Sequence, residues 1–67
     1  MTNTSALKDA IQKKGIKLQF IASELGISRT SLYKKIENQH EFKASEIKKI
    51  SDLLKLSAKQ QEYIFFA

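Results

Sequence analysis

The part of the chain that most restricts its fold is residues 18–36, LQFIASELGISRTSLYKKI. Ile21, Ala22 and Leu25 are spaced i, i+1 and i+4, so they share one face of a helix. Gly26 follows directly, and because it has no Cβ it readily takes the left-handed conformation that ends many helices. These positions predict a short helix that ends in a tight turn.

The residues after this turn predict a second short helix. Ile27 supplies an apolar anchor for the turn, and Ser28 is a residue type that caps a helix by accepting a hydrogen bond from a free backbone N–H. Leu32 and Ile36 lie four residues apart and therefore form the buried side of this helix. The polar and cationic side chains between them project in other directions.

The order Ala-x3-Gly-Ile-Ser-x3-Leu-x3-Ile over residues 22–36 resembles the helix-turn-helix of Cro- and cI-type (XRE-like) phage regulators. This family includes small Cro-like repressors and modulators of repression. The resemblance continues through most of the chain and implies a lambda-repressor-like DNA-binding domain, a compact bundle of five short helices with a central helix-turn-helix. The competing interpretation is an ordinary helical hairpin, which does not need Gly and Ser at these offsets.

Composition favours the all-α class and a single domain over residues 1–67. The chain has no proline and two glycines, whereas good helix formers are frequent. Apolar spacing and capping residues predict five helices, over residues 5–14, 18–25, 29–37 and 44–54, and from residue 58 to near the end. Thr4 or Ser5 is expected to cap the first helix, and Ser57 with Gln60 the last. Asn38 is expected to close the third helix in the left-handed conformation, and Phe42 to enter the core.

The charge balance favours a polyanionic partner. The net charge is +5, and binding to phosphates releases condensed counterions. Eleven of the twelve cations are lysines, which suit phosphate contact better than bidentate base contact. The single arginine, Arg29, lies at the predicted start of the third helix.

The resemblance implies which residues contact operator DNA. Arg29, Thr30, Tyr33 and Lys34 occupy the positions that enter the major groove in the family. Arg can pair with guanine through two parallel hydrogen bonds, while Thr and Tyr offer hydroxyls or apolar contact to a thymine methyl. Lys35 is expected to be a solvated surface residue. Phosphate contacts are expected from Lys17, Gln19, Ser28, Asn38 and Lys43.

Three positions at the start of the second helix depart from the family pattern. Lys17 stands where a capping Ser or Thr is usual, and Leu18 stands where many relatives have a Gln that bonds a DNA phosphate. Gln19 is one residue further along the chain, so its side chain points about 100° away from that of Leu18 around the helix axis. Phe20 occupies a usually polar position, and we expect it to pack against another helix; exposure for a partner is the alternative.

The C-terminal aromatic residues indicate a possible contact surface. Tyr63, Ile64, Phe65 and Phe66 cannot all face one side of a helix, because successive residues rotate by about 100°. Two or three of them are expected to complete the core, and the others are available for a homodimer or another protein. Phe20, Tyr63, Phe65 and Phe66 are therefore candidate partner contacts. They motivate an alternative function, an antirepressor or modulator that binds a cognate phage repressor.

Other function classes fit the sequence poorly. There is no cysteine, His40 is the only histidine, and no Gly-rich phosphate loop occurs, so we expect no enzyme activity, metal, cofactor or small-molecule substrate. No run of about 18 apolar residues predicts a membrane span, and MTNTSALKD is not typical of a secretory signal. The expected location is the cytoplasm of a bacterial host cell.

Overall fold

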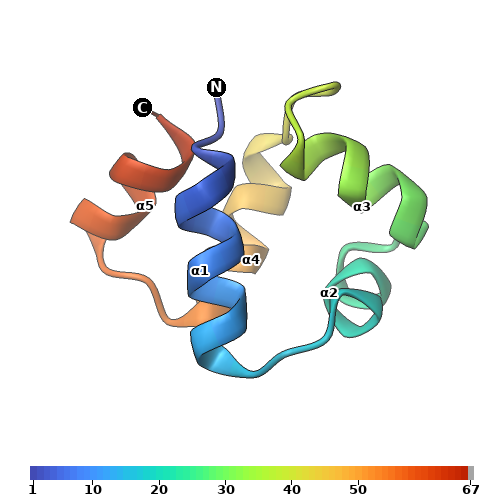
Figure 1. Ribbon diagram of the computed structural model, residues 1–67, viewed down its shortest axis with the longest axis horizontal. Helices are drawn as coiled ribbons and strands as arrows, with labels where there is room; N and C mark the ends of the chain where they lie inside the picture. The colour runs from blue at the N-terminus through green and yellow to red at the C-terminus, as the bar shows by residue number, and fades with distance from the viewer. Residues whose placement is uncertain (67) are drawn as a thin grey trace.

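Five α-helices make up most of the computed structural model, which describes residues 1–66 (Figure 1). They are α1 (Thr4–Lys14), α2 (Leu18–Leu25), α3 (Arg29–Ile36), α4 (Ala44–Leu54) and α5 (Ala58–Phe65). Residues 1–66 contain no strand, so the predicted all-α class is confirmed. Within the same residues, none of the helices has the length and apolar character needed to cross a membrane.

The helices pack around α1 and α4. In Figure 1, α1 crosses in front of α4, with α5 on one side and α2 and α3 on the other. α1 contacts α3, α4 and α5, while α2 contacts α3 and α4. The apolar faces predicted from residue spacing meet between these helices. They form the core of Leu7, Ile11, Ile21, Ala22, Leu32, Ile36, Phe42, Ile47, Ile50, Leu54, Ile64 and Phe65.

The beginning of α1 differs from the prediction. The helix starts at Thr4, because the side chain of Asn3 caps it by accepting a hydrogen bond from the Ala6 N–H at 3.1 Å. The predicted caps, Thr4 and Ser5, are therefore wrong. The Thr4 hydroxyl instead donates to the Ile36 carbonyl and connects α1 to the end of α3.

The turn between α2 and α3 has the predicted geometry. Gly26 takes the left-handed conformation with φ +70°, and its neighbour Ile27 donates its N–H to the Ala22 carbonyl at 3.0 Å. Ser28 caps α3 by accepting a hydrogen bond from the Ser31 N–H, also at 3.0 Å. These local contacts fix the direction in which α3 leaves the turn.

The end of α3 is attached to the N-terminal segment. The helix ends at Ile36, one residue before the predicted Glu37, and Asn38 has the predicted left-handed conformation with φ +65°. The Asn38 side chain accepts from the Thr2 N–H at 2.9 Å and donates to the Thr2 carbonyl at 2.7 Å. It therefore ends the helix and holds the beginning of the chain.

Aromatic residues of α5 divide between core and surface. Ile64 and Phe65 are buried, while Tyr63 and Phe66 are exposed, so two of the four residues complete the core as predicted. Phe65 packs edge-on against Phe42, with ring centroids 5.5 Å apart. The identification of Phe65 as a partner contact is therefore wrong.

Phe20 is also placed differently from its expected position. Its side chain is 49% exposed, so the expectation that it packs against another helix is wrong. The reason is rotational, since Ile21 and Ala22 turn fully inward and leave Phe20 on the outer side of α2.

Ser57 and Gln60 form the predicted capping box at α5.

Candidate nucleic-acid interface

α3 has one buried face and one open face. Leu32 and Ile36 are buried, as their spacing predicts. The outer face carries the four predicted base-reading residues, all exposed: Arg29, Thr30, Tyr33 and Lys34. These four line a single open hollow of about 480 Å³, together with Leu18 of α2 and Gln39 of the following loop. The structure therefore brings the predicted set together on one surface.

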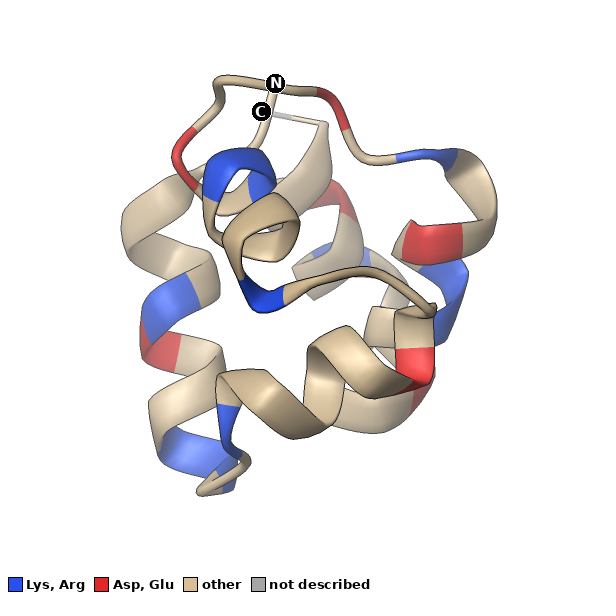
Figure 2. Ribbon diagram, turned by 90° about the vertical axis from the view of Figure 1, so that its right-hand side faces the viewer, with Lys and Arg blue, Asp and Glu red and all other residues tan. Residues whose placement is uncertain are grey.

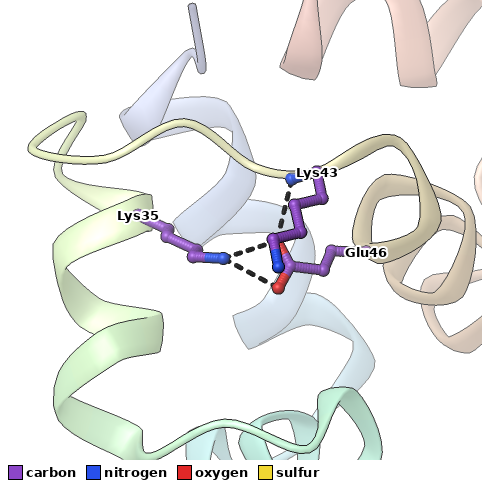
Figure 3. A network of polar contacts seen from close by, with 3 residues as sticks. All are labelled: Lys35, Lys43 and Glu46. Atoms are coloured by element: carbon purple, nitrogen blue, oxygen red, sulfur yellow. Dashed lines mark hydrogen bonds and ion pairs between the residues drawn. The ribbon is translucent and has the colours of Figure 1, made fainter.

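The rear of α3 is attached to α4 by an ion pair. The Lys35 ammonium lies 2.6 and 2.7 Å from the two carboxylate oxygens of Glu46, and the two side chains are 13% and 9% exposed (Figure 3). Glu46 Oε1 also accepts a hydrogen bond from the Lys43 backbone N–H at 2.8 Å. The expectation that Lys35 is a solvated residue is therefore wrong.

This arrangement favours the ionised form of Glu46. Burial disfavours a charged carboxylate, but hydrogen bonds from the Lys35 ammonium and the Lys43 N–H act in the opposite direction and prevail. The pKa of Glu46 consequently lies below its ordinary value. A lysine side chain has no acceptor atom, so at α4 only the Glu46 half of a capping box forms.

A second cationic contact comes from α1. The Lys8 ammonium lies 2.6 Å from a carboxylate oxygen of Glu37 and 5.7 Å from the centroid of the Tyr33 ring. The hydrogen bond to Glu37 raises the pKa of Lys8. At this distance the ammonium attracts the ring face, so Lys8 restrains Tyr33 from the side of α1.

Four of the five predicted phosphate-contact residues are exposed at or near the starts of helices. Lys17 and Gln19 are exposed at the start of α2, Ser28 caps α3, and Lys43 is exposed at the start of α4. Lys17 provides no side-chain cap to α2, in agreement with its unusual residue type.

Asn38 does not fit a phosphate contact. Its amide nitrogen donates to the Thr2 carbonyl and to the Thr4 hydroxyl at 3.3 Å. Both of its N–H donors are therefore engaged inside the molecule, and none remains for a phosphate oxygen.

Cationic residues lie at both ends of α3. The helix begins with Arg29 and has Lys34 and Lys35 in its last turn, and residues 29–36 contain no acidic residue. Figure 2, which looks onto the side of the molecule that carries α2 and α3, shows blue segments at both ends of this helix. The open face of α3 therefore combines hydrogen-bond donors with positive charge.

Two residues of the hollow were missed as site residues by sequence reasoning. The residue type of Leu18 indicates only the loss of a phosphate contact, and Gln39 lies after the end of α3, where no sequence pattern predicts a role for it. The left-handed Asn38 turns the chain back, so the Gln39 N–H reaches the Lys34 carbonyl at 2.8 Å. A left-handed residue at a helix end was the available signal, since the residue after it returns to the last turn.

Within residues 1–66, no group of three or more His, Cys, Asp or Glu side chains is placed to hold a metal ion.

Comparisons with known proteins identify no relative of this chain. No family model, curated protein or solved structure matches the chain.

Proposed function

We propose that this chain is a sequence-specific DNA-binding transcriptional regulator, similar to small phage Cro-like repressors. In this proposal α2 and α3 act as a helix-turn-helix, and α3 enters the major groove of operator DNA. One observation carries it: Arg29, Thr30, Tyr33 and Lys34 surround one open hollow on α3. The Arg29, Thr30 and Lys34 side chains make no hydrogen bond or ion pair with other residues of 1–66, so their donors are available to a ligand.

The four residues have complementary chemistry for base edges. The guanidinium of Arg29 can donate two parallel hydrogen bonds to guanine, and Lys34 can donate to an acceptor on a base or a phosphate. Thr30 and Tyr33 each combine a hydroxyl with an apolar surface. A bidentate contact to the correct base contributes about 1–3 kcal/mol of discrimination.

Phosphate contacts would fix the position of α3 on the duplex. The Ser28 hydroxyl accepts from Ser31 and retains its own proton for a phosphate oxygen. Lys17 is exposed beside the start of α2, where no side chain caps the first backbone N–H groups. Together with the net charge of +5, these groups provide the sequence-independent part of binding.

Operator recognition would involve two copies of the chain. A homodimer on a near-palindromic operator places its two recognition helices about 34 Å apart, one turn of the duplex. A regulator of this kind works in the cytoplasm of the bacterial host, where the operator is accessible.

The proposal is tested by selecting a random duplex pool with purified protein at near-physiological salt and sequencing the retained fraction. We expect enrichment of one near-palindromic sequence. Arg29→Ala should then weaken binding to that sequence by about 5- to 150-fold relative to random duplex, the range that corresponds to one lost base contact.

The matched control is Lys48→Ala, which removes one positive charge from α4. Lys48 lines a different hollow, between α4 and α5, and is not part of the α3 surface. This variant should keep the ratio of specific to random binding. An equal reduction of both affinities by Arg29→Ala would refute base reading by this residue.

The exposed aromatic residues support a second candidate function, a modulator that binds a cognate phage repressor. Phe20, Tyr63 and Phe66 are 49%, 65% and 62% exposed. Exposed aromatic side chains are frequent anchors of protein interfaces. Tight association with such a repressor, combined with no retention of any duplex, would favour this function over the first.

A further inference from the structure

Leu18 has an unusual position for an aliphatic residue of a DNA-reading surface. It lines the hollow that contains Arg29 and Lys34, and it also lines a smaller hollow of about 190 Å³ between α1 and α3. Tyr33 is the only other residue described in both linings. The apolar surfaces of these two side chains therefore lie beside the cationic residues of α3, and together we call them the apolar wall.

This wall limits which groups of a duplex can lie against it. A polar base edge or a phosphate placed on Leu18 would lose hydrogen bonds to water and gain none in return. The groups that bases present in the major groove are hydrogen-bond donors and acceptors, with one apolar exception, the C5-methyl group of thymine. A thymine methyl is thus the base group that fits this wall best.

We propose that Leu18 and Tyr33 together contact the C5-methyl group of a thymine and make the protein selective for thymine at that position. This inference rests on the proposed DNA-binding function and identifies a specificity residue on α2, outside α3. The Lys8 ammonium lies beside the Tyr33 ring of this wall and is itself paired with Glu37.

The test uses the duplex enriched from the random pool, with each thymine replaced in turn by uracil. This replacement removes a single methyl group and leaves every hydrogen-bonding atom in place. We expect one or two positions per half-site at which uracil weakens binding about fourfold, the loss that corresponds to unburying one methyl group. At the remaining positions the two duplexes should bind equally.

Leu18→Ala should remove this preference for thymine over uracil. The matched control is Phe20→Ala, which truncates an exposed apolar residue of the same helix that does not line the hollow. Phe20→Ala should keep the full preference. The ratio of the two affinities is measured on one protein preparation, so a lower folded fraction in Leu18→Ala does not change it.

Three outcomes would overturn the inference, and they differ in whether the proposed DNA-binding function is refuted as well. Equal binding of thymine and uracil duplexes at every position refutes methyl recognition but leaves DNA binding intact. A preference that persists in Leu18→Ala refutes the role of Leu18. Failure to enrich any duplex refutes the proposed function, and the thymine selectivity is refuted with it.

Discussion

Replacing Glu46 by Gln should destabilise the protein strongly, although the two residues are nearly the same size. The Glu46 carboxylate accepts hydrogen bonds from the Lys35 ammonium and the Lys43 backbone N–H. Gln keeps one acceptor oxygen for the Lys43 N–H but removes the negative charge. The substitution therefore isolates the cost of leaving the Lys35 ammonium without a counter-charge.

The expected magnitude follows from burial. Removing one partner of a buried ion pair costs about 3–5 kcal/mol, whereas an exposed pair contributes about 0–1 kcal/mol. The side chains of Lys35 and Glu46 are 13% and 9% exposed, which places the pair near the buried limit with slight access to water. We therefore expect a loss of about 3 kcal/mol in the free energy of unfolding. For a domain of this length, whose total stability is about 3–10 kcal/mol, this is a large fraction.

Urea unfolding at pH 7, followed by the far-ultraviolet circular dichroism of the helices, measures this loss. Lys35→Met and the double variant complete a cycle. The double variant should be more stable than Glu46→Gln alone, because no unpaired charge then remains beside α4. A loss below about 0.5 kcal/mol, or strictly additive effects, would refute the ion pair as a significant contact.

The same pair makes stability dependent on pH. Because its folded-state pKa lies below the ordinary value of 4.5, the Glu46 carboxylate contributes stability that is fully present above that value. This contribution is lost as pH falls through the folded-state pKa. Glu46→Gln should therefore lose less stability than the wild-type protein between pH 6 and pH 3. Identical pH profiles of the two proteins would contradict the lowered pKa.

Three further substitutions test the helix ends by urea unfolding. Ser28→Ala should cost about 1 kcal/mol, because α3 loses its side-chain cap; a variant with wild-type stability would contradict that role. Lys55→Gly should stabilise the protein by about 0.5–1 kcal/mol, because Lys55 ends α4 with φ +53°, where glycine is not strained; a loss would contradict the assignment. Asn38→Gly should instead destabilise it by at least about 1 kcal/mol. Glycine also suits φ +65°, but the hydrogen bonds to Thr2 are lost, and an unchanged midpoint would show that they contribute little.

The turn and the helix faces could be predicted because their signals are local in sequence. Gly26 and Ser28 act on backbone groups within four residues of themselves, so residue type and spacing are sufficient to place them. The core faces could be predicted equally well, because apolar residues at every third or fourth position lie on one face of a helix. Phe20 was predicted to be packed because it is a large apolar residue beside that face, but Ile21 and Ala22 already fill the inner side of α2 and leave it exposed.

Contacts between helices could not be predicted in the same way. Lys35 and Glu46 are eleven residues apart on different helices, and nothing in either residue type distinguishes this pair from the other possible pairs of lysine and acid. The contact of Lys8 with Glu37 and the apolar wall of Leu18 and Tyr33 likewise depend on how α1, α2 and α3 pack. Such pairings become visible only when the crossing of the helices is known.

The start, the buried side and the end of α3 are held by hydrogen bonds and an ion pair, whereas its outer side chains are not. Ser28 caps its first turn, the ion pair between Lys35 and Glu46 holds its rear, and the Thr4 hydroxyl binds the Ile36 carbonyl at its end. The donors of the outer face lack partners of this kind among residues 1–66. A fixed backbone lowers the ordering cost of binding, while free donors retain their full capacity for a ligand. Under the proposed DNA-binding function, this combination suits a rigid, repetitive partner such as a DNA groove, because the contacts that hold the buried side of α3 also position its outer face.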